Sequence, residues 1–161
     1  MNKKRVVATL IILPLFLLCS CGRVKYRSDV SCDELTDIIE SSNEKEYQRY
    51  DRDYLEYIID DTSCCSDHSI IYSSEINDID ELGIFKANSE KDADVLYGML
   101  KDYISDEKEG QRAFIASYAP NELPKLDSAR VERFGVYVIY SIATPEDSEK
   151  AISAITTALA E

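Results

Sequence analysis

Apolar residues recur every three or four positions in three parts of the chain, and this spacing predicts amphipathic helices. Ser31-Cys32-Asp33-Glu34 has the form of a capping box and marks the start of the first helix. Ser89 caps the second, and Thr144 followed by Pro145 begins a C-terminal helix. The predicted apolar faces are Leu35, Ile38 and Ile39 in the first helix, Ala93, Leu96, Met99, Leu100, Tyr103 and Ile104 in the second, and Ala151, Ile152, Ile155 and Leu159 in the third.

A fourth helix is expected in the charged, tyrosine-rich segment 43–61. Its aromatic and aliphatic residues also recur at three- and four-residue intervals, which would bring them to one helical face. Tyrosine buries its ring while keeping its hydroxyl solvated, so we interpret this face as part of the core. A platform that binds carbohydrate or peptide is the alternative. The stripe consists of Tyr47, Tyr50, Tyr54, Tyr57 and Ile58.

Runs of residues with β propensity lie between the helices. Residues 69–74 and 82–87 predict two strands. Residues 130–143 predict a hairpin that turns at Gly135, with one long strand and a glycine bulge as the alternative. The composition of 60–67 predicts a loop.

The connection between the second helix and the hairpin contains turn signals. Gly110 closes the helix, or Phe114, Ile115 and Tyr118 continue it as a second segment. The prolines that follow, Pro120 and Pro124, predict a loop.

Together these elements predict a single α+β domain over 31–161, in which helices pack on a small, mainly antiparallel sheet of about four strands. A domain of this length buries an adequate core without a metal or a disulfide. The second helix and the strands have no other apolar surface to cover, so they should share one core. The residues expected to be mutually buried are Phe85, Leu96, Leu100, Val138 and Ile152.

The N-terminus has the three parts of a bacterial lipoprotein signal peptide. A basic stretch, Met1 to Arg5, precedes an apolar stretch, Val6 to Leu18, that is too short for a spanning helix of roughly 20 residues. Ser20 is a small residue directly before Cys21, whereas Cys19 lacks one. We therefore expect cleavage after residue 20 and lipid attachment at Cys21.

This processing predicts how the mature protein is held. Residues 1–20 are the signal peptide and 21–30 form a lipidated tether. Two or three acyl chains, such as palmitate, hold a protein on a membrane far more firmly than one. The expected location is the outer face of the cytoplasmic membrane in a Gram-positive bacterium.

The chain is strongly acidic, with a formal net charge of −13 at pH 7. Removal of the signal peptide makes it more negative, because that segment contains three cations and no acid. Such a field repels nucleic acid and anionic headgroups, which excludes nucleic-acid binding and leaves the lipid as the expected contact with the membrane.

Three cysteines remain besides the lipidated one, so at most one disulfide can form. Cys32 paired with Cys64 or Cys65 would leave one free thiol, and the sequence leaves this open. His68 lies close to the adjacent pair, but neighbouring side chains point apart on an extended chain and zinc ligands are normally spaced by two or more residues. We predict no metal ligand and no cofactor.

Acidic pairs are frequent, and chance explains each of them in so acidic a chain. A glycosidase needs two carboxylates at a set separation, which sequence spacing does not define. Residues 77–81 have the acids of a calcium loop, but Gly83 falls beyond them. No catalytic residue is therefore predicted. The pairs are Asp51 with Asp53, Asp60 with Asp61, and Asp78 with Asp80.

Several short segments resemble an uncharacterised family, catalogued as domain of unknown function four-three-five-eight. They are Asp80-Glu81-Leu82-Gly83-Ile84-Phe85-Lys86-Ala87, Glu90-Lys91-Asp92-Ala93, Tyr118-Ala119-Pro120, Leu126, Ala129-Arg130-Val131 and Gly135-Val136-Tyr137-Val138. The resemblance runs from about residue 35 to 159. It implies an exported lipoprotein of low-GC Gram-positive bacteria and no particular activity, ligand or catalytic residue.

Two functions follow as hypotheses. The first is a non-enzymatic binding or accessory module of the cell envelope, tethered to the membrane through Cys21, whose partner is an envelope protein or a small ligand. The alternative is an envelope enzyme or thiol-redox factor that uses Cys64 or Cys65 with His68 as a base. The second requires His68 within hydrogen-bond reach of a thiol in a concave pocket.

Overall fold

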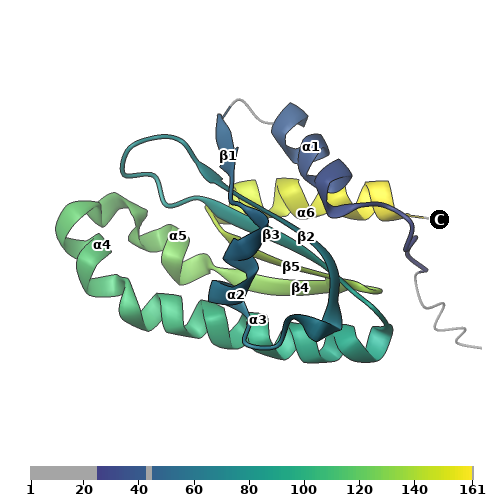
Figure 1. Cartoon of the computed structure of the whole chain (residues 1–161). Helices are drawn as coiled ribbons and strands as arrows, with labels where there is room; N and C mark the ends of the chain where they lie inside the picture. Colours follow the sequence, from purple (N-terminus) through teal and green to yellow (C-terminus); the bar gives the residue numbers. More distant parts are fainter. Residues whose placement is uncertain (1–24, 43–44, 161) are drawn as a thin grey trace, which may run out of the picture.

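A computed structural model describes residues 25–42 and 45–160 as an α+β fold built on a five-stranded antiparallel sheet (Figure 1). The strand order is β1-β2-β3-β5-β4. This confirms the predicted architecture and adds one edge strand. The strands are β1 (Tyr47–Arg49), β2 (Cys65–Ser73), β3 (Glu81–Ala87), β4 (Arg130–Phe134) and β5 (Tyr137–Ile142).

Helices cover both faces of the sheet. The long helix α3 lies on one face, and α1 and α6 lie on the other (Figure 1). No helix within the described ranges is long and apolar enough to cross a membrane. The helices are α1 (Cys32–Ser42), α2 (Leu55–Ile58), α3 (Glu90–Gly110), α4 (Arg112–Tyr118), α5 (Leu123–Ser128) and α6 (Pro145–Leu159), with 3-10 turns η1 (Arg52–Tyr54), η2 (Thr62–Cys64) and η3 (Pro120–Glu122).

Alternation along the central strands divides the apolar residues between two cores. Phe85 and Val138 are buried beneath α3 together with Leu96 and Leu100, as predicted. Ile152 is not part of this core, and its assignment there was wrong. It is partly buried on α6, whose packed residues Ala151, Ile155 and Leu159 belong to the core on the opposite face.

The predicted helix starts are confirmed. The Ser89 hydroxyl accepts a hydrogen bond from the backbone N–H of Asp92 at 3.1 Å, and Thr144 accepts one from Asp147 at the same distance. Ser31 and Glu34 form the reciprocal bonds of a capping box. Caps depend on residues three positions apart, so local sequence suffices to predict them.

The turn between β4 and β5 decides between the two alternatives for 130–143. Gly135 has a φ of +60°, which a residue with a side chain rarely adopts, and the strands on either side of it pair antiparallel. The segment is therefore the predicted hairpin and not one bulged strand.

The single helix expected over 43–61 was wrong. Tyr47 to Arg49 form β1, which pairs with the end of β2, and the backbone N–H of Tyr50 donates to the carbonyl of Ile70 at 3.0 Å. The segment then makes η1 and the short helix α2. Pairing with a distant strand replaces the local hydrogen bonds of a helix, and the three- and four-residue spacing of the tyrosines does not reveal that pairing.

Two expected loops contain regular structure. Pro120 and Pro124 stand in the first turns of η3 and α5, where a missing N–H costs nothing, so the predicted loop is largely helical. Within 60–67, η2 is followed by the first residues of β2.

Residues 26–30 pack on the domain. Tyr26 pairs with Ala160 after α6, and its ring contacts that of Phe134 edge-on at 5.6 Å between centroids. The Tyr137 hydroxyl donates to the carbonyl of the buried Val30 at 2.6 Å. The predicted signal peptide 1–20 and Cys21 lie outside the described residues.

Candidate functional site

A cleft of about 220 Å³ opens at the end of the sheet where β2 leads into β3. The C-terminal part of α3 and the start of α4 form its other side. It combines acidic, aromatic and aliphatic side chains. Its lining is Tyr50, Tyr72, Ser73, Asp78, Ile79, Asp80, Glu81, Glu107, Gln111, Phe114, Ile115, Leu126 and Ile142.

Glu81 is the first residue of β3, and its carboxylate is held by tyrosine hydroxyls. Tyr140 donates to Oε1 at 2.6 Å and Tyr103 donates to the same oxygen at 3.0 Å. The Tyr50 hydroxyl also hydrogen bonds to this carboxylate. Burial raises the pKa of Glu81 above its usual range, and the three hydroxyls oppose part of that rise by stabilising the anion.

Gly83 makes room for this arrangement. It lies directly opposite Tyr140 in the β3–β5 pairing, and a Cβ placed on it would approach Cε1 of the Tyr140 ring to 2.3 Å. The same Cβ would approach the Phe85 ring to 2.6 Å. The absence of a side chain at Gly83 therefore lets the Tyr140 ring lie across β3 and reach Glu81.

Tyrosines of the misassigned segment form one wall of the site. The rings of Tyr50 and Tyr54 stack with centroids 3.8 Å apart and planes inclined by 6°. Tyr72 of β2 lies against Tyr50 at 4.3 Å. Two of the tyrosines predicted to form a helical stripe thus meet through stacking, in a turn that follows an edge strand.

Glu107 of α3 is the second carboxylate of the cleft. Burial raises its pKa, and the negative charge of Glu81 raises it further. No ion pair joins Glu81 or Glu107 to a lysine or arginine in ranges 25–42 and 45–160. The cleft therefore contains two acids without a cationic partner in that part of the chain.

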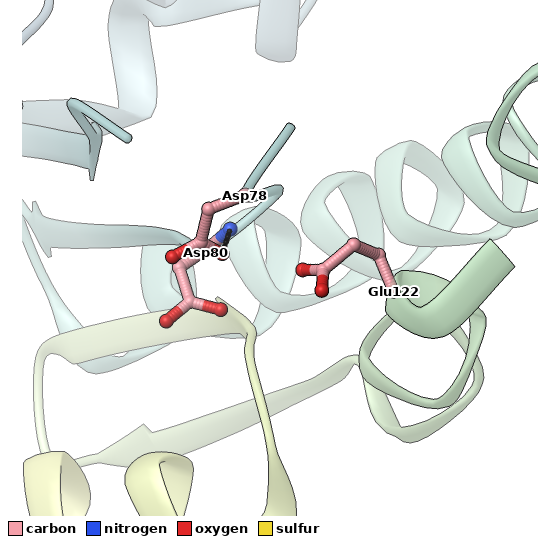
Figure 2. Close-up of side chains that lie close together, drawn as sticks. All are labelled: Asp78, Asp80 and Glu122. Carbon is pink, nitrogen blue, oxygen red and sulfur yellow. Dashed lines mark hydrogen bonds between the residues drawn. The ribbon is translucent and has the colours of Figure 1, made fainter. Parts of the chain in front are cut away.

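A second acidic group adjoins the cleft. Figure 2 shows Asp78 and Asp80 on the segment before β3, with Glu122 extending toward them from η3. One oxygen from each carboxylate lies within 4.8 Å of the others, a spacing that suits a metal ion.

An ammonium group stands among these three acids. Lys125 Nζ lies 2.5 Å from Asp78, 2.8 Å from Asp80 and 2.6 Å from Glu122. Lys45 also forms an ion pair with Asp80. The lysine therefore occupies the position that a cation would take, and these acids form an ion-pair network.

The two aspartates of the network differ in their proton affinity. Burial alone would raise the pKa of Asp78, but hydrogen bonds from Lys125 and the Asp80 backbone outweigh it and hold the pKa well below its usual range. Asp80 is more deeply buried, and burial raises its pKa despite hydrogen bonds from Lys125 and Lys45.

The thiols and the histidine do not assemble. Cys64 Sγ donates to the carbonyl of Asp61 at 3.3 Å and Cys65 Sγ to that of Asp67 at 3.2 Å. His68 Nε2 lies 3.1 Å from the carbonyl of Arg52. Burial raises the pKa of Cys65 to about 11, which disfavours the reactive thiolate.

The structure also shows whether the three described cysteines form a disulfide. Cys32, Cys64 and Cys65 are all free, so none of the possible bridges joins them. Burial raises the pKa of Cys32 as well.

Comparison with known proteins gives a family and no further relative. The family model described as Domain of unknown function (DUF4358) matches residues 38–143, and the chain belongs to this family. No curated protein and no solved structure matches the chain. The matched range includes the cleft and begins after the predicted lipoprotein signal.

Sequence reasoning missed Glu81 and Glu107 as site residues. One signal was present, because alternation places Glu81, Gly83 and Phe85 on the same face of β3, and that face is otherwise apolar. A carboxylate at such a position needs hydrogen-bond donors. The partners Tyr103 and Tyr140 are 22 and 59 residues away and could not be identified by spacing.

Proposed function

We propose that this protein is a lipid-anchored binding module of the cell envelope, attached through Cys21, and that the cleft is its binding site. The observation that carries the proposal is the position of the cleft relative to the point where the chain joins the domain. Tyr26 contacts the β4–β5 turn, at one end of the sheet. Glu81 and Ile142 line the cleft at the opposite end.

The short chain between Cys21 and Tyr26 determines how far the domain can lie from the lipid. Tyr26 lies five positions after Cys21, and a chain can span at most about 18 Å over that separation. A lipid on Cys21 would therefore hold the Tyr26 end near the bilayer. The cleft lies a strand length further out, about 17 Å, and would face away from the membrane.

The same geometry favours binding over the thiol-redox alternative. Cys64 and Cys65 each donate to a backbone carbonyl, and His68 contacts the carbonyl of Arg52 instead of a thiol. The cleft, in contrast, presents side chains that suit ligand recognition: a few polar groups among apolar and aromatic ones.

Metabolic labelling with an alkyne fatty acid tests the anchor. In a Gram-positive host, the full chain should incorporate the label and sediment with membranes. Cys21→Ala should lose both properties, whereas Cys19→Ala is the matched control and should retain them. Label on the Cys21→Ala protein would contradict the proposal.

Energy transfer to a headgroup-labelled lipid tests the orientation. In a Cys65→Ser background, a fluorophore on Ser28→Cys should transfer energy more efficiently than one on Ile76→Cys, because both side chains are exposed but at opposite ends of the sheet. Equal or reversed efficiencies would contradict a cleft that faces away from the membrane.

A further inference from the structure

The charges that line the cleft are of one sign. Four acids and no lysine or arginine belong to the lining. Two of the acids, Asp78 and Asp80, are paired with Lys45 and Lys125, neither of which belongs to the lining. Glu81 and Glu107 have no such partner in the described part of the chain, so they are the acids of the cleft that can pair with a cationic ligand.

The tyrosine hydroxyls use only part of the hydrogen-bonding capacity of the Glu81 carboxylate. Tyr103 and Tyr140 both donate to Oε1, and the Tyr50 hydroxyl is a third donor, whereas a carboxylate has roughly four positions at which it accepts hydrogen bonds. The carboxylate of Glu81 therefore retains capacity for a further donor. A charged donor on this carboxylate would form a stronger bond than a neutral one.

The closeness of Glu81 and Glu107 in the cleft points to the same requirement. Burial raises the pKa of Glu107, and the negative charge of Glu81 raises it further. A cation bound between them would remove the repulsion between the two charges and offset the cost of burying both carboxylates.

We propose that the cleft binds an alkylammonium ion, with the ammonium between Glu81 and Glu107 and the alkyl part against the aliphatic and aromatic wall. This assignment rests on the proposed function and names its ligand class. The aromatic residues Tyr50, Tyr72 and Phe114 add surfaces that attract cations. The volume of 220 Å³ lies below the roughly 300–1,000 Å³ of drug-sized sites and suits a small ligand.

The wall of the cleft argues against an inorganic divalent ion in the same place. Calcium requires six to eight oxygen ligands. The lysines already pair with Asp78 and Asp80, which leaves the carboxylates of Glu81 and Glu107 as the charged oxygen ligands of the cleft. The aliphatic part of the lining provides no oxygen, and it consists of Ile79, Ile115, Leu126 and Ile142.

Titration calorimetry on the full chain in a nonionic detergent tests the ligand class. Butylammonium chloride should bind saturably, and butanol, which has the same alkyl group without the charge, should not. Glu81→Gln and Glu107→Gln should each weaken binding by about tenfold or more, because each removes one charged acceptor. Glu109→Gln removes an exposed acid from α3, the helix that also contains Glu107, and should leave binding unchanged.

Circular dichroism establishes that each variant is folded. If Glu81→Gln does not fold, Glu107→Gln supplies the comparison.

The outcomes distinguish a free amine from a lysine side chain as the ligand, and they distinguish failure of the ligand class from failure of the lipid anchor. Stronger binding of Nα-acetyl-lysine amide than of butylammonium would support the ligand class and assign the amine to a lysine side chain of a partner. Absence of saturable binding, equal binding of butanol, or equal weakening by Glu109→Gln would overturn the assignment. Calcium that displaces butylammonium completely would also overturn it. None of these results changes the fatty-acid labelling of Cys21, so the anchor and the ligand class fail independently.

Discussion

Two neighbouring groups of carboxylates in this protein are stabilised in different ways. Asp78 and Asp80 are surrounded by ammonium groups, and the three acids around Lys125 lie within 2.8 Å of it. Glu81, the next residue along the chain, is surrounded by tyrosine hydroxyls and shares its cleft with another acid. One group has cationic partners, and the other has none among the described residues.

Strand geometry explains how adjacent residues reach such different surroundings. Successive side chains point to opposite faces of a strand. Glu81 faces α3 and meets Tyr103 and Tyr140, while Asp80 meets Lys45, which also lies 3.5 Å from Asp147 at the start of α6. An acidic sequence alone therefore does not identify a binding site, because the partners of each acid decide whether it can still pair with a ligand.

The largest effect should come from removing a cation from the group that has cationic partners. Lys125→Met leaves Asp78, Asp80 and Glu122 facing one another, and breaking a buried ion pair in this way costs about 3–5 kcal/mol of unfolding free energy. Urea unfolding at pH 7 measures it. Lys91→Met, an exposed lysine of α3, is the control and should change little.

The Lys125→Met variant also tests whether the ammonium occupies a position in which a metal ion could bind. If the lysine occupies the position of a cation, calcium should restore part of the lost stability in the variant and have no such effect on the parent protein. A variant as stable as the parent, with or without calcium, would show that the ammonium does not hold these acids together.

Local rules predicted much of the fold and little of the site. The caps at Ser89 and Thr144 and the turn at Gly135 depend on residues within three or four positions, and the structure confirms them. The strand β1 depends on pairing between Tyr47 and Ser73, which no local pattern reveals. The tyrosine spacing was therefore misinterpreted as a helix.

The site shows the same limitation in its side chains. Acidic pairs such as Asp78 with Asp80 were visible in the sequence, but Lys125, which neutralises them, lies more than 40 residues away. The acids without a cationic partner among the described residues, Glu81 and Glu107, belong to different elements and form no motif. Their proximity is a consequence of how α3 packs on the sheet.

A smaller effect is expected from the hydroxyl that holds Glu81. Tyr140→Phe removes the 2.6 Å hydrogen bond but keeps the buried ring, so the unfolding free energy at pH 7 should fall by about 1–3 kcal/mol. Chemical unfolding of Tyr118→Phe, whose side chain is exposed, provides the control. An unchanged Tyr140→Phe would mean that Glu81 does not depend on this donor.

The smallest effects should be opposite in sign for the two groups and should depend on pH. The pKa of Glu81 is raised in the folded state, so its ionisation costs stability as the pH rises from the unfolded value near 4.5 through the folded value. Glu81→Gln removes that cost and should unfold at the same or a higher temperature than the parent at pH 7. The gain should disappear below about pH 4.5.

Asp78 should behave in the opposite way, because its pKa is lowered in the folded state. Its contribution is complete above the unfolded value near 3.8 and is lost as the pH falls through the folded value. Asp78→Asn should therefore melt at a lower temperature than the parent at pH 7, because its unfolding free energy falls by about 1 kcal/mol or more, and the difference should shrink on acidification. Melting curves of both variants between pH 3 and 8 measure how the melting temperature of each depends on pH. Parallel profiles would mean that the lysine-bound and tyrosine-bound acids are equivalent. A Glu81→Gln variant that is less stable than the parent at pH 7 would show that the carboxylate of Glu81 stabilises the folded state.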